Sequence, residues 1–276
     1  MIPLRTIADR AVFPIGLGVM ALDEYPPKAT EADAISFLEY AAEIGITFMD
    51  TADVYGLGRN EQLLGKALTA EQKEKIRIAT KGGCTRPGGH DWDTDGRSVH
   101  LKQACTESLQ RLGMKQIYLY QLHAPDHRVP FEESLHALKE LQNTKLIKHI
   151  GLSNINLEQL WQAQKIITVV SVQNHFNLAH KGDEKELLPY LTQHKIAYIP
   201  YFPLGSGRLL KDTRLIRIAQ ELKLTPSQVA LAWILQKWST AIPIPGTKNK
   251  EHLMDNMKAA EVKLPEKVME ELDGLY

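Results

Sequence analysis

The chain has 276 residues, with 33 basic and 33 acidic residues, and 43% of its residues are hydrophobic. This length suits one large domain or two small ones, and the neutral charge balance gives no electrostatic footprint for nucleic acid or an anionic membrane. No apolar run reaches the roughly 20 residues of a transmembrane helix, and the N-terminus lacks the pattern of a signal peptide. The two cysteines, Cys84 and Cys105, form no metal-ligand or disulfide pattern. We therefore expect a cytoplasmic protein without a metal site.

Short apolar runs bounded by turn residues recur along the chain and predict buried parallel strands. The first predicted strand covers residues 13–17 and the last covers residues 241–244. The six between them cover residues 46–49, 76–80, 117–122, 147–151, 169–173 and 196–200.

The segments between these strands carry the signals of helices. Thr30 and Asp33 have the spacing of a capping box, and Ser98 is a candidate N-cap for a further helix. Thr225 is a candidate N-cap with a proline at the first helical position and a glutamine at the third, which is a strong helix start. The run at 229–235 is apolar nearly all round and predicts a well-buried helix.

Eight strand-helix units in about 250 residues predict a single-domain (β/α)8 barrel over residues 1–276. The alternative is an open doubly wound sheet, which is disfavoured because no strand is followed by G-x-G-x-x-G. The closest segment, residues 16–21, has only the first two glycines of that motif. The longest stretch without predicted structure is 82–97, and a loop of that length is usually functional or mobile.

Polar side chains follow three neighbouring predicted strands, where a barrel places its active site. Asp50 and Tyr55 follow the second strand, Lys81 follows the third, and His123 follows the fourth. Each residue also has a purely structural explanation. The carboxylate is explained as a turn cap, the tyrosine as a packing residue, the lysine as a solvated charge and the histidine as a hydrogen-bonded structural group. Their convergence favours one catalytic group over four independent roles, whereas Asp53 is interpreted as a turn residue.

These residue types predict a tuned proton donor. A free tyrosine has a pKa near 10, and a nearby ammonium lowers that pKa. Lys81 is expected to supply the ammonium, Asp50 to keep it charged, and His123 to hold a substrate oxygen or share the proton. Such a donor suits a carbonyl group that accepts hydride.

Over essentially its whole length the chain resembles the aldo-keto reductase superfamily. The resemblance rests on the ordered segments GITFMDTADVYGLGRNEQLLGKAL, IATK, YLYQLH, KHIGLSN, VSVQN, YFPLG and IPIPGTKNKEHLMDN. It implies an NADPH-dependent carbonyl reductase on a (β/α)8 barrel, and its Asp-Tyr-Lys-His tetrad matches Asp50, Tyr55, Lys81 and His123. The segments HIGLSN, VQN and IAYIPYFPLG most resemble a bacterial branch that includes pyridoxal reductases.

The resemblance also implies the residues that bind the nicotinamide half of the cofactor. Ser153, Asn154 and Gln173 match groups that hold the carboxamide, and Tyr201 matches the aromatic residue that stacks on the nicotinamide ring. Further cofactor residues implied here are Met20, Asp50 and, in a glycine-containing loop over the pyrophosphate, Leu204, Gly205 and Ser206.

The segment GTKNKEHLMDN resembles the site for the adenosine 2′-phosphate and adenine. The implied residues are Gly246, Thr247, Lys248, His252, Asp255 and Asn256, together with backbone amides at the start of the final helix. Family members often have an arginine where His252 stands. Because histidine is only partly charged at neutral pH and lacks a bidentate fork, we expect a preference for NADPH that strengthens below about pH 7.

The leading function is therefore reduction of a small aldehyde or ketone, with pyridoxal reduction as a narrower form. Two alternatives are a nucleotide-binding regulatory subunit with little turnover and a barrel isomerase or aldolase with Lys81 as a Schiff-base lysine. The intact tetrad disfavours the first, and the second leaves the predicted nicotinamide residues without a role. We expect specificity to reside in residues 21–29, in residues 82–97 with Trp92 as a pocket wall, and at the chain end. No pattern indicates an oligomeric state.

Overall fold

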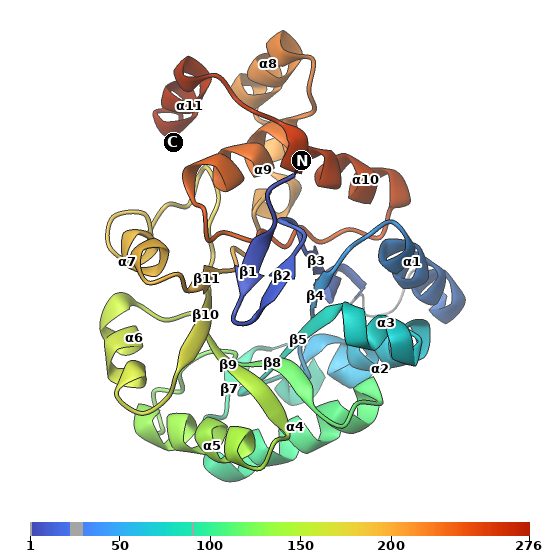
Figure 1. The fold of residues 1–276 in the computed structure, drawn as a ribbon, viewed down its shortest axis with the longest axis vertical. Helices are drawn as coiled ribbons and strands as arrows, with labels where there is room; N and C mark the ends of the chain where they lie inside the picture. Colours follow the sequence, from blue (N-terminus) through green and yellow to red (C-terminus); the bar gives the residue numbers. More distant parts are fainter. Residues whose placement is uncertain (1, 23–29, 90) are drawn as a thin grey trace.

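Seven parallel strands form a curled sheet encircled by helices (Figure 1). The computed structural model describes residues 2–22, 30–89 and 91–276, so the predicted specificity residues 23–29 lie outside it. Along the sheet the strands are β11 (Ala197–Tyr198), β10 (Val169–Gln173), β9 (Ile147–Ser153), β8 (Ile117–Leu122), β5 (Arg77–Gly82), β4 (Phe48–Asp50) and β3 (Leu17–Gly18). Six of the predicted strands are thereby confirmed in type and approximate position.

The eighth predicted strand, at residues 241–244, is not a regular strand, but it lies between the two edges of the sheet. The Ile242 amide donates to the Tyr198 carbonyl at 2.8 Å on one side. On the other side the Gly16 amide donates to the Pro243 carbonyl at 3.0 Å. The segment therefore bridges β11 to the residues beside β3.

Proline explains why this segment forms only isolated bridges. Pro243 and Pro245 have no backbone N–H group, so a continuous ladder on both sides is impossible. The first predicted strand, at residues 13–17, is also shorter than expected, because only Leu17 belongs to β3.

The helices pack around the outside of the sheet (Figure 1). In chain order they are α1 (Glu31–Glu43), α2 (Arg59–Ala67), α3 (Ala70–Lys75), α4 (Ser98–Leu112), α5 (Phe131–Asn143), α6 (Leu157–Gln164), α7 (Leu187–Gln193), α8 (Thr213–Leu222), α9 (Pro226–Lys237), α10 (Lys250–Lys258) and α11 (Glu266–Asp273). Single 3-10 turns are η1 (Val19–Leu22), η2 (Tyr55–Gly58), η3 (Pro87–Gly89), η4 (Gly205–Gly207), η5 (Leu209–Lys211) and η6 (Ala259–Glu261). The main apolar core lies between the sheet and these helices.

The predicted helix starts are mostly confirmed. The capping box of Thr30 begins α1, and that of Thr225 begins α9. Residues 229–235 of α9 are all buried, as predicted. The prediction of Ser98 as an N-cap was wrong, because Arg97 holds that position and Ser98 is the first helical residue. Its amide is capped instead by the Glu133 carboxylate at 2.9 Å.

A short antiparallel hairpin that the sequence did not predict precedes the sheet. It consists of β1 (Arg5–Ile7) and β2 (Arg10–Val12) and lies across the amino ends of the parallel strands. The Tyr118 hydroxyl, at the start of β8, donates to the Ile7 carbonyl at 2.6 Å. Asp9, in the hairpin turn, pairs with Lys148 at the start of β9 at 2.7 Å. The hairpin therefore covers one end of the sheet and leaves the carboxyl ends of the strands for a site.

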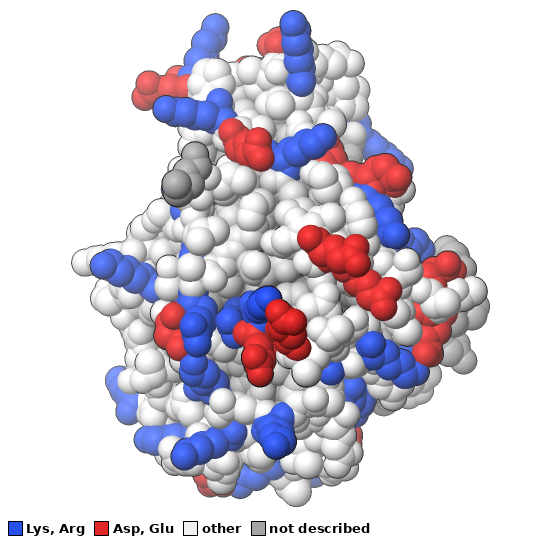
Figure 2. Space-filling view, turned by 45° about the vertical axis from the view of Figure 1, so that its right-hand side comes forward, with Lys and Arg blue, Asp and Glu red and all other residues white. Residues whose placement is uncertain are grey.

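Charges of both signs are distributed over the surface. Basic and acidic side chains are interspersed on the face in Figure 2, and much of that face is uncharged. None of the helices in the described part of the chain is long and apolar enough to cross a membrane.

Candidate active site

The four predicted catalytic residues meet at the carboxyl ends of neighbouring strands. Asp50 ends β4, Lys81 lies near the end of β5, His123 follows β8, and Tyr55 begins η2. The Lys81 ammonium lies 2.5 Å from Asp50 Oδ1 and 3.4 Å from the Tyr55 hydroxyl. The rings of Tyr55 and His123 meet edge to face, with centroids 5.8 Å apart. The structure therefore brings together the residues that the sequence singled out.

A cavity of about 890 Å³ opens over this group. Asp50, Tyr55 and His123 line it, whereas Lys81 lies beneath them with no exposed surface. The cavity also contains most of the predicted cofactor residues: Met20, Ser153, Asn154, Gln173, Tyr201, Leu204, Ser206, Gly246, Thr247, His252, Asp255 and Asn256. Gly205 and Lys248 are not among its lining residues.

Lys81 is held as a buried cation. Burial alone would lower the pKa of Lys81, but the adjacent Asp50 carboxylate and the Tyr55 hydroxyl outweigh that effect and raise it. The ammonium also donates to the Thr51 carbonyl at 2.8 Å. A buried charge is tolerated where it is paired and hydrogen-bonded in this way.

Two buried amides hold the other side of Asp50. Gln173 Nε2 donates to Asp50 Oδ2 at 2.8 Å, and Gln121 Nε2 donates to the same oxygen at 3.2 Å. The sequence did not single out Gln121. The available signal was an amide in the middle of the otherwise apolar strand IYLYQL, because a fully buried polar side chain needs a partner.

The expected lowering of the Tyr55 pKa was wrong in its net direction. Burial raises the pKa of Tyr55, and the Lys81 ammonium lowers it by less than burial raises it. Lys81 therefore acts in the predicted direction but does not outweigh desolvation. Tyr55 stays protonated at neutral pH, which is the state that a proton donor requires.

His123 is kept neutral by its surroundings. Burial lowers the pKa of His123 well below its usual range, and the Lys81 charge adds to that effect. Its Nδ1 atom is buried and has no hydrogen-bond partner among the described residues. A neutral imidazole carries one N–H donor, which can be aimed at a ligand in the cavity.

Trp92 forms part of the cavity wall, as predicted. Its ring meets the His123 ring at 5.9 Å and the Tyr55 ring at 6.4 Å, both edge to face. The segment that carries it is not structureless, contrary to the prediction. β6 (Cys84–Thr85) pairs with β7 (Asp93–Thr94), and Arg128 holds Asp93 at 2.8 Å. This small hairpin presents Trp92 to the cavity.

The predicted nicotinamide residues form a chain of hydrogen bonds. The Ser153 hydroxyl donates to the Gln173 carbonyl at 2.7 Å, and Asn154 Nδ2 donates to Ser153 Oγ at 3.1 Å. The Tyr201 hydroxyl donates to Asn154 Oδ1 at 2.8 Å. These side chains lie together in one wall of the cavity.

The predicted pyrophosphate loop has an unusual backbone. Gly205, Ser206 and Gly207 have φ angles of 59°, 54° and 82°, so three successive residues are left-handed. The amides of Gly205 and Gly207 are used within the loop, by the carbonyls of Phe202 and Leu204. Ser206 and Gly207 line the cavity, which places this turn at its edge.

At the far end of the cavity, Asp255 is held by the start of α9. It accepts hydrogen bonds from the Thr225 hydroxyl at 2.6 Å, from Ser227 at 2.7 Å and from Gln228 at 2.8 Å. Thr225 and Ser227 line the cavity as well, and the sequence did not assign them to a site. α10, whose N-cap is Asn249, is not the final helix as expected, because α11 follows it.

Asp53 occupies a turn, as interpreted from the sequence, but it is not an ordinary turn residue. Its amide donates to the Lys81 carbonyl at 3.2 Å. The residue is partly exposed, yet its Oδ1 atom is buried without a hydrogen-bond partner among the described residues. Burial, and then the Glu61 charge, raise the pKa of Asp53 to about 8.

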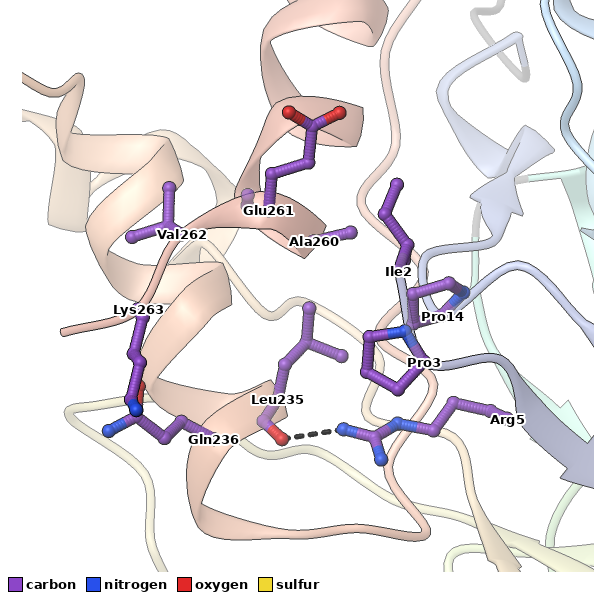
Figure 3. A pocket seen from close by; sticks show the side chains of 11 residues that line it. Ile2, Pro3, Arg5, Pro14, Leu235, Gln236, Ala260, Glu261, Val262 and Lys263 are labelled. Atoms are coloured by element: carbon purple, nitrogen blue, oxygen red, sulfur yellow. Dashed lines mark hydrogen bonds between the residues drawn. The ribbon is translucent and has the colours of Figure 1, made fainter.

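A second hollow, of about 570 Å³, lies far from these strand ends. It is bounded by the N-terminal segment, by the end of α9 and by residues 259–263, and Arg5 crosses it to the Leu235 carbonyl (Figure 3). None of the predicted site residues lines it. In the described part of the chain, no group of His, Cys, Asp and Glu side chains is arranged to hold a metal ion.

A family model named aldo/keto reductase family matches residues 14–276. The chain belongs to that family. It is 40% identical over 274 residues to an uncharacterized oxidoreductase of Schizosaccharomyces pombe, which covers 97% of this chain and 88% of the relative. It is 35% identical to the pyridoxine 4-dehydrogenase of Escherichia coli over 98% of this chain and 97% of the relative.

A solved aldo/keto reductase from Klebsiella pneumoniae, in complex with NADP and acetate, superposes with a TM-score of 0.86. It is 27% identical, and the match covers 100% of this chain and 95% of that chain. The predicted family and an oxidoreductase activity are thus confirmed, and the predicted NADPH cofactor agrees with the NADP bound to the Klebsiella relative. The same likeness implies the (β/α)8 barrel, of which the described residues form seven regular strands.

Proposed function

We propose that this protein is an NADPH-dependent reductase that converts an aldehyde or ketone to an alcohol. The observation that carries the proposal is the group of Tyr55, Lys81 and His123 at the base of a cavity that also contains an aromatic ring and several amides. We further propose that residues 1–276 form one barrel domain, with residues 241–246 in the place of the eighth strand. A cytoplasmic location stays a prediction.

Side chains and backbone amides along the cavity suit both the nicotinamide end and the adenosine 2′-phosphate end of NADPH. The side chains of Asn154 and Gln173 match a carboxamide, and the Tyr201 ring matches a flat heterocycle. At the other end, Thr247 and the first amides of α10 suit an anion, since a helix N-terminus favours negative charge. When bound, NADPH supplies the hydride for the carbonyl carbon. The complex of the Klebsiella relative with NADP supports this assignment.

The residues of the chain supply the proton and the charge stabilisation. The Tyr55 hydroxyl donates its proton to the carbonyl oxygen of the substrate as negative charge develops there. The Lys81 ammonium, 3.4 Å away, stabilises the phenolate that this transfer leaves. Asp50 keeps Lys81 charged, and neutral His123 donates an N–H to the same substrate oxygen.

A pyridoxal reductase is the narrower form of this proposal. The similarity to the Escherichia coli pyridoxine 4-dehydrogenase supports it. The edge-to-face arrangement of Trp92 with His123 and Tyr55 also offers an aromatic wall to a flat substrate.

Steady-state NADPH oxidation with a panel of aldehydes and ketones, pyridoxal included, tests the function. We expect turnover with NADPH in preference to NADH, because Thr247 and the start of α10 suit an anion. Lys248→Ala should weaken NADPH binding and leave NADH binding unchanged. Tight NADPH binding without turnover of any carbonyl would favour a regulatory subunit instead. Borohydride trapping of substrate on Lys81 would favour Schiff-base chemistry.

A further inference from the structure

Two histidines, His175 and His180, continue the Tyr201 ring as a stack. We propose that His175, with His180 behind it, is a positioning residue that holds the Tyr201 ring as the platform for the nicotinamide. This inference rests on the proposed function, because it requires NADPH to place its nicotinamide on Tyr201.

The three rings are close to parallel. The centroids of Tyr201 and His175 are 5.4 Å apart with an interplanar angle of 12°, and those of His175 and His180 are 4.0 Å apart with an angle of 13°. His180 is exposed and His175 is half-buried, so the stack runs from the surface inward to the cavity wall. Since His175 lies in an offset stack against one face of Tyr201, we expect a ligand ring that stacks on Tyr201 to use the opposite face.

The backbone fixes His175 in register with Tyr201. The Tyr201 amide donates to the Asn174 carbonyl at 3.0 Å, and the Phe176 amide donates to the Tyr201 carbonyl at 3.4 Å. These bonds lie on either side of His175 in the sequence, and the two residues form a parallel bridge. The backbone of His175 is therefore held beside that of Tyr201.

A tight turn brings His180 back over His175. The amides of Asn177 and His180 donate to each other's carbonyls at 3.1 and 3.0 Å. The turn is anchored to the loop after Tyr201, because Asn177 Nδ2 donates to the Phe202 carbonyl at 2.9 Å. The same amide group lies 3.2 Å from His175 Nε2. One asparagine thus connects the stack to the segment that carries the platform.

The remaining contacts hold Tyr201 from the other directions. Its hydroxyl donates to Asn154 Oδ1 at 2.8 Å, and the Phe202 ring meets it edge to face with centroids 5.3 Å apart. With the hydroxyl pinned and one edge blocked, the remaining motion is a tilt of the ring, and His175 opposes that tilt. Burial, and then the charges of His180 and Arg208, lower the pKa of His175, so it stacks as a neutral ring at neutral pH.

Two ligands separate this role from a general effect on the fold. NADPH contains both halves of the cofactor, whereas 2′,5′-ADP contains the adenosine 2′-phosphate half and no nicotinamide. We expect His175→Leu to raise the Kd of NADPH by about 2- to 10-fold, the range of one stacked aromatic pair, and to leave the Kd of 2′,5′-ADP unchanged. His175→Phe keeps a ring and should remain close to wild type. His180→Leu should show a smaller loss in the same direction.

A matched control exists at the end of α7, where the exposed C-cap residue His194 stacks on Tyr190 with ring centroids 3.9 Å apart. His194→Leu should change neither Kd. Equal losses for both ligands in His175→Leu, or a Phe variant as weak as the Leu variant, would overturn the proposal. Tyr201→Leu separates the two levels of inference. If it leaves NADPH binding unchanged, the proposed nicotinamide site itself fails; if it weakens NADPH while His175→Leu does not, only the stack proposal fails.

Discussion

The two ends of the parallel sheet carry the same four residue types in different settings. At the carboxyl end, Asp50, Tyr55, Lys81 and His123 meet under a cavity, and the side chains of Lys81 and Asp50 are only 0% and 3% exposed. The charge of Lys81 is therefore poorly screened, and it acts strongly on the hydroxyl 3.4 Å away.

At the amino end, Asp9, Tyr118, Lys148 and His149 meet beneath the N-terminal hairpin. Asp9 lies 2.7 Å from Lys148, 2.9 Å from His149 and 3.2 Å from the Tyr118 hydroxyl. Here the side chains of Lys148 and Asp9 are 38% and 46% exposed, so water screens the pair. None of the four lines the cavity. The same four residue types are thus buried beneath a cavity at one end, where we propose catalysis, and fasten a hairpin at the other.

The largest expected difference between the two ends is in their tyrosines. Tyr55→Phe removes the proposed proton donor, so kcat should fall by about 10²- to 10⁴-fold, the range of a general acid. NADPH affinity should change little, because the hydroxyl is not among the proposed cofactor contacts. Steady-state kinetics and nucleotide titration measure both quantities. A variant that keeps more than about half of the wild-type kcat would remove Tyr55 from this role.

The two lysines should differ next. Lys81→Met should lower kcat and move the alkaline limit of activity to higher pH. The reason is that the Lys81 charge lowers the pKa of Tyr55, so removal of Lys81 raises the pKa of Tyr55. Lys148→Met is the matched change at the amino end and should leave the pH profile as in wild type. Circular dichroism must first show that Lys81→Met folds, because Asp50 loses its partner. An identical pH profile for both variants would contradict the assignment.

Tyr118→Phe should affect stability and leave catalysis intact. The variant removes the donor to the Ile7 carbonyl, and an unsatisfied buried acceptor costs about 1 to 3 kcal/mol. Denaturant unfolding should therefore show a lower free energy of unfolding, while kcat stays within about 2-fold of wild type. Comparable kcat losses in Tyr118→Phe and Tyr55→Phe would erase the distinction between the two ends.

The smallest effect is expected for Asp9→Asn. Hydrogen bonds from Lys148 and His149 hold the pKa of Asp9 below its ordinary value, against a smaller opposing effect of burial. A group with a depressed pKa contributes stability at pH values above its ordinary pKa of 3.8, and this stability is lost as the pH falls. The contribution at neutral pH should be less than about 1 kcal/mol, because the pair is exposed. Melting temperatures of variant and wild type should differ slightly at neutral pH and converge in acid; a gap that widens in acid refutes this sign.

The sequence predicted one of these two groups and not the other, for a physical reason. Asp50, Lys81 and His123 lie at or just beyond the ends of apolar strands, and Tyr55 begins the turn that follows Asp50. The strand positions therefore locate these side chains at one rim. The amino-end group depends on a hairpin of two three-residue strands, too short for a periodic pattern. Asp9 meets its lysine partner across 139 positions of sequence, and no local signal reports such a contact.

Other gaps have equally specific causes. The eighth strand is irregular because Pro243 and Pro245 cannot donate to a ladder. A role for Gln121 could not be predicted, because its amide lies inside a strand and its hydrogen-bond partner, Asp50, is identified only in the folded structure. The net shift of the Tyr55 pKa depends on burial, which the order of residues along the chain does not reveal.

Asp53 has a thermodynamic consequence for the whole chain. Its pKa is about 8 in the folded protein against an ordinary value of 3.8. Between these pH values the native state retains a proton that the unfolded chain has released, so folding at neutral pH takes up a proton at this carboxyl. For a raised pKa, the stability contributed is complete below the ordinary value and is lost as the pH rises through about 8.

Asp53→Asn keeps the shape of the side chain without a titratable proton. Its melting temperature relative to wild type should therefore rise steadily from mildly acidic to mildly alkaline pH, and calorimetric refolding in buffers of different ionisation enthalpy should show one proton fewer taken up. A constant difference across that range would place the ionisation of Asp53 outside it. A proton is therefore a ligand of the native state and binds at the Asp53 carboxyl. The backbone amide of the same residue donates to the Lys81 carbonyl.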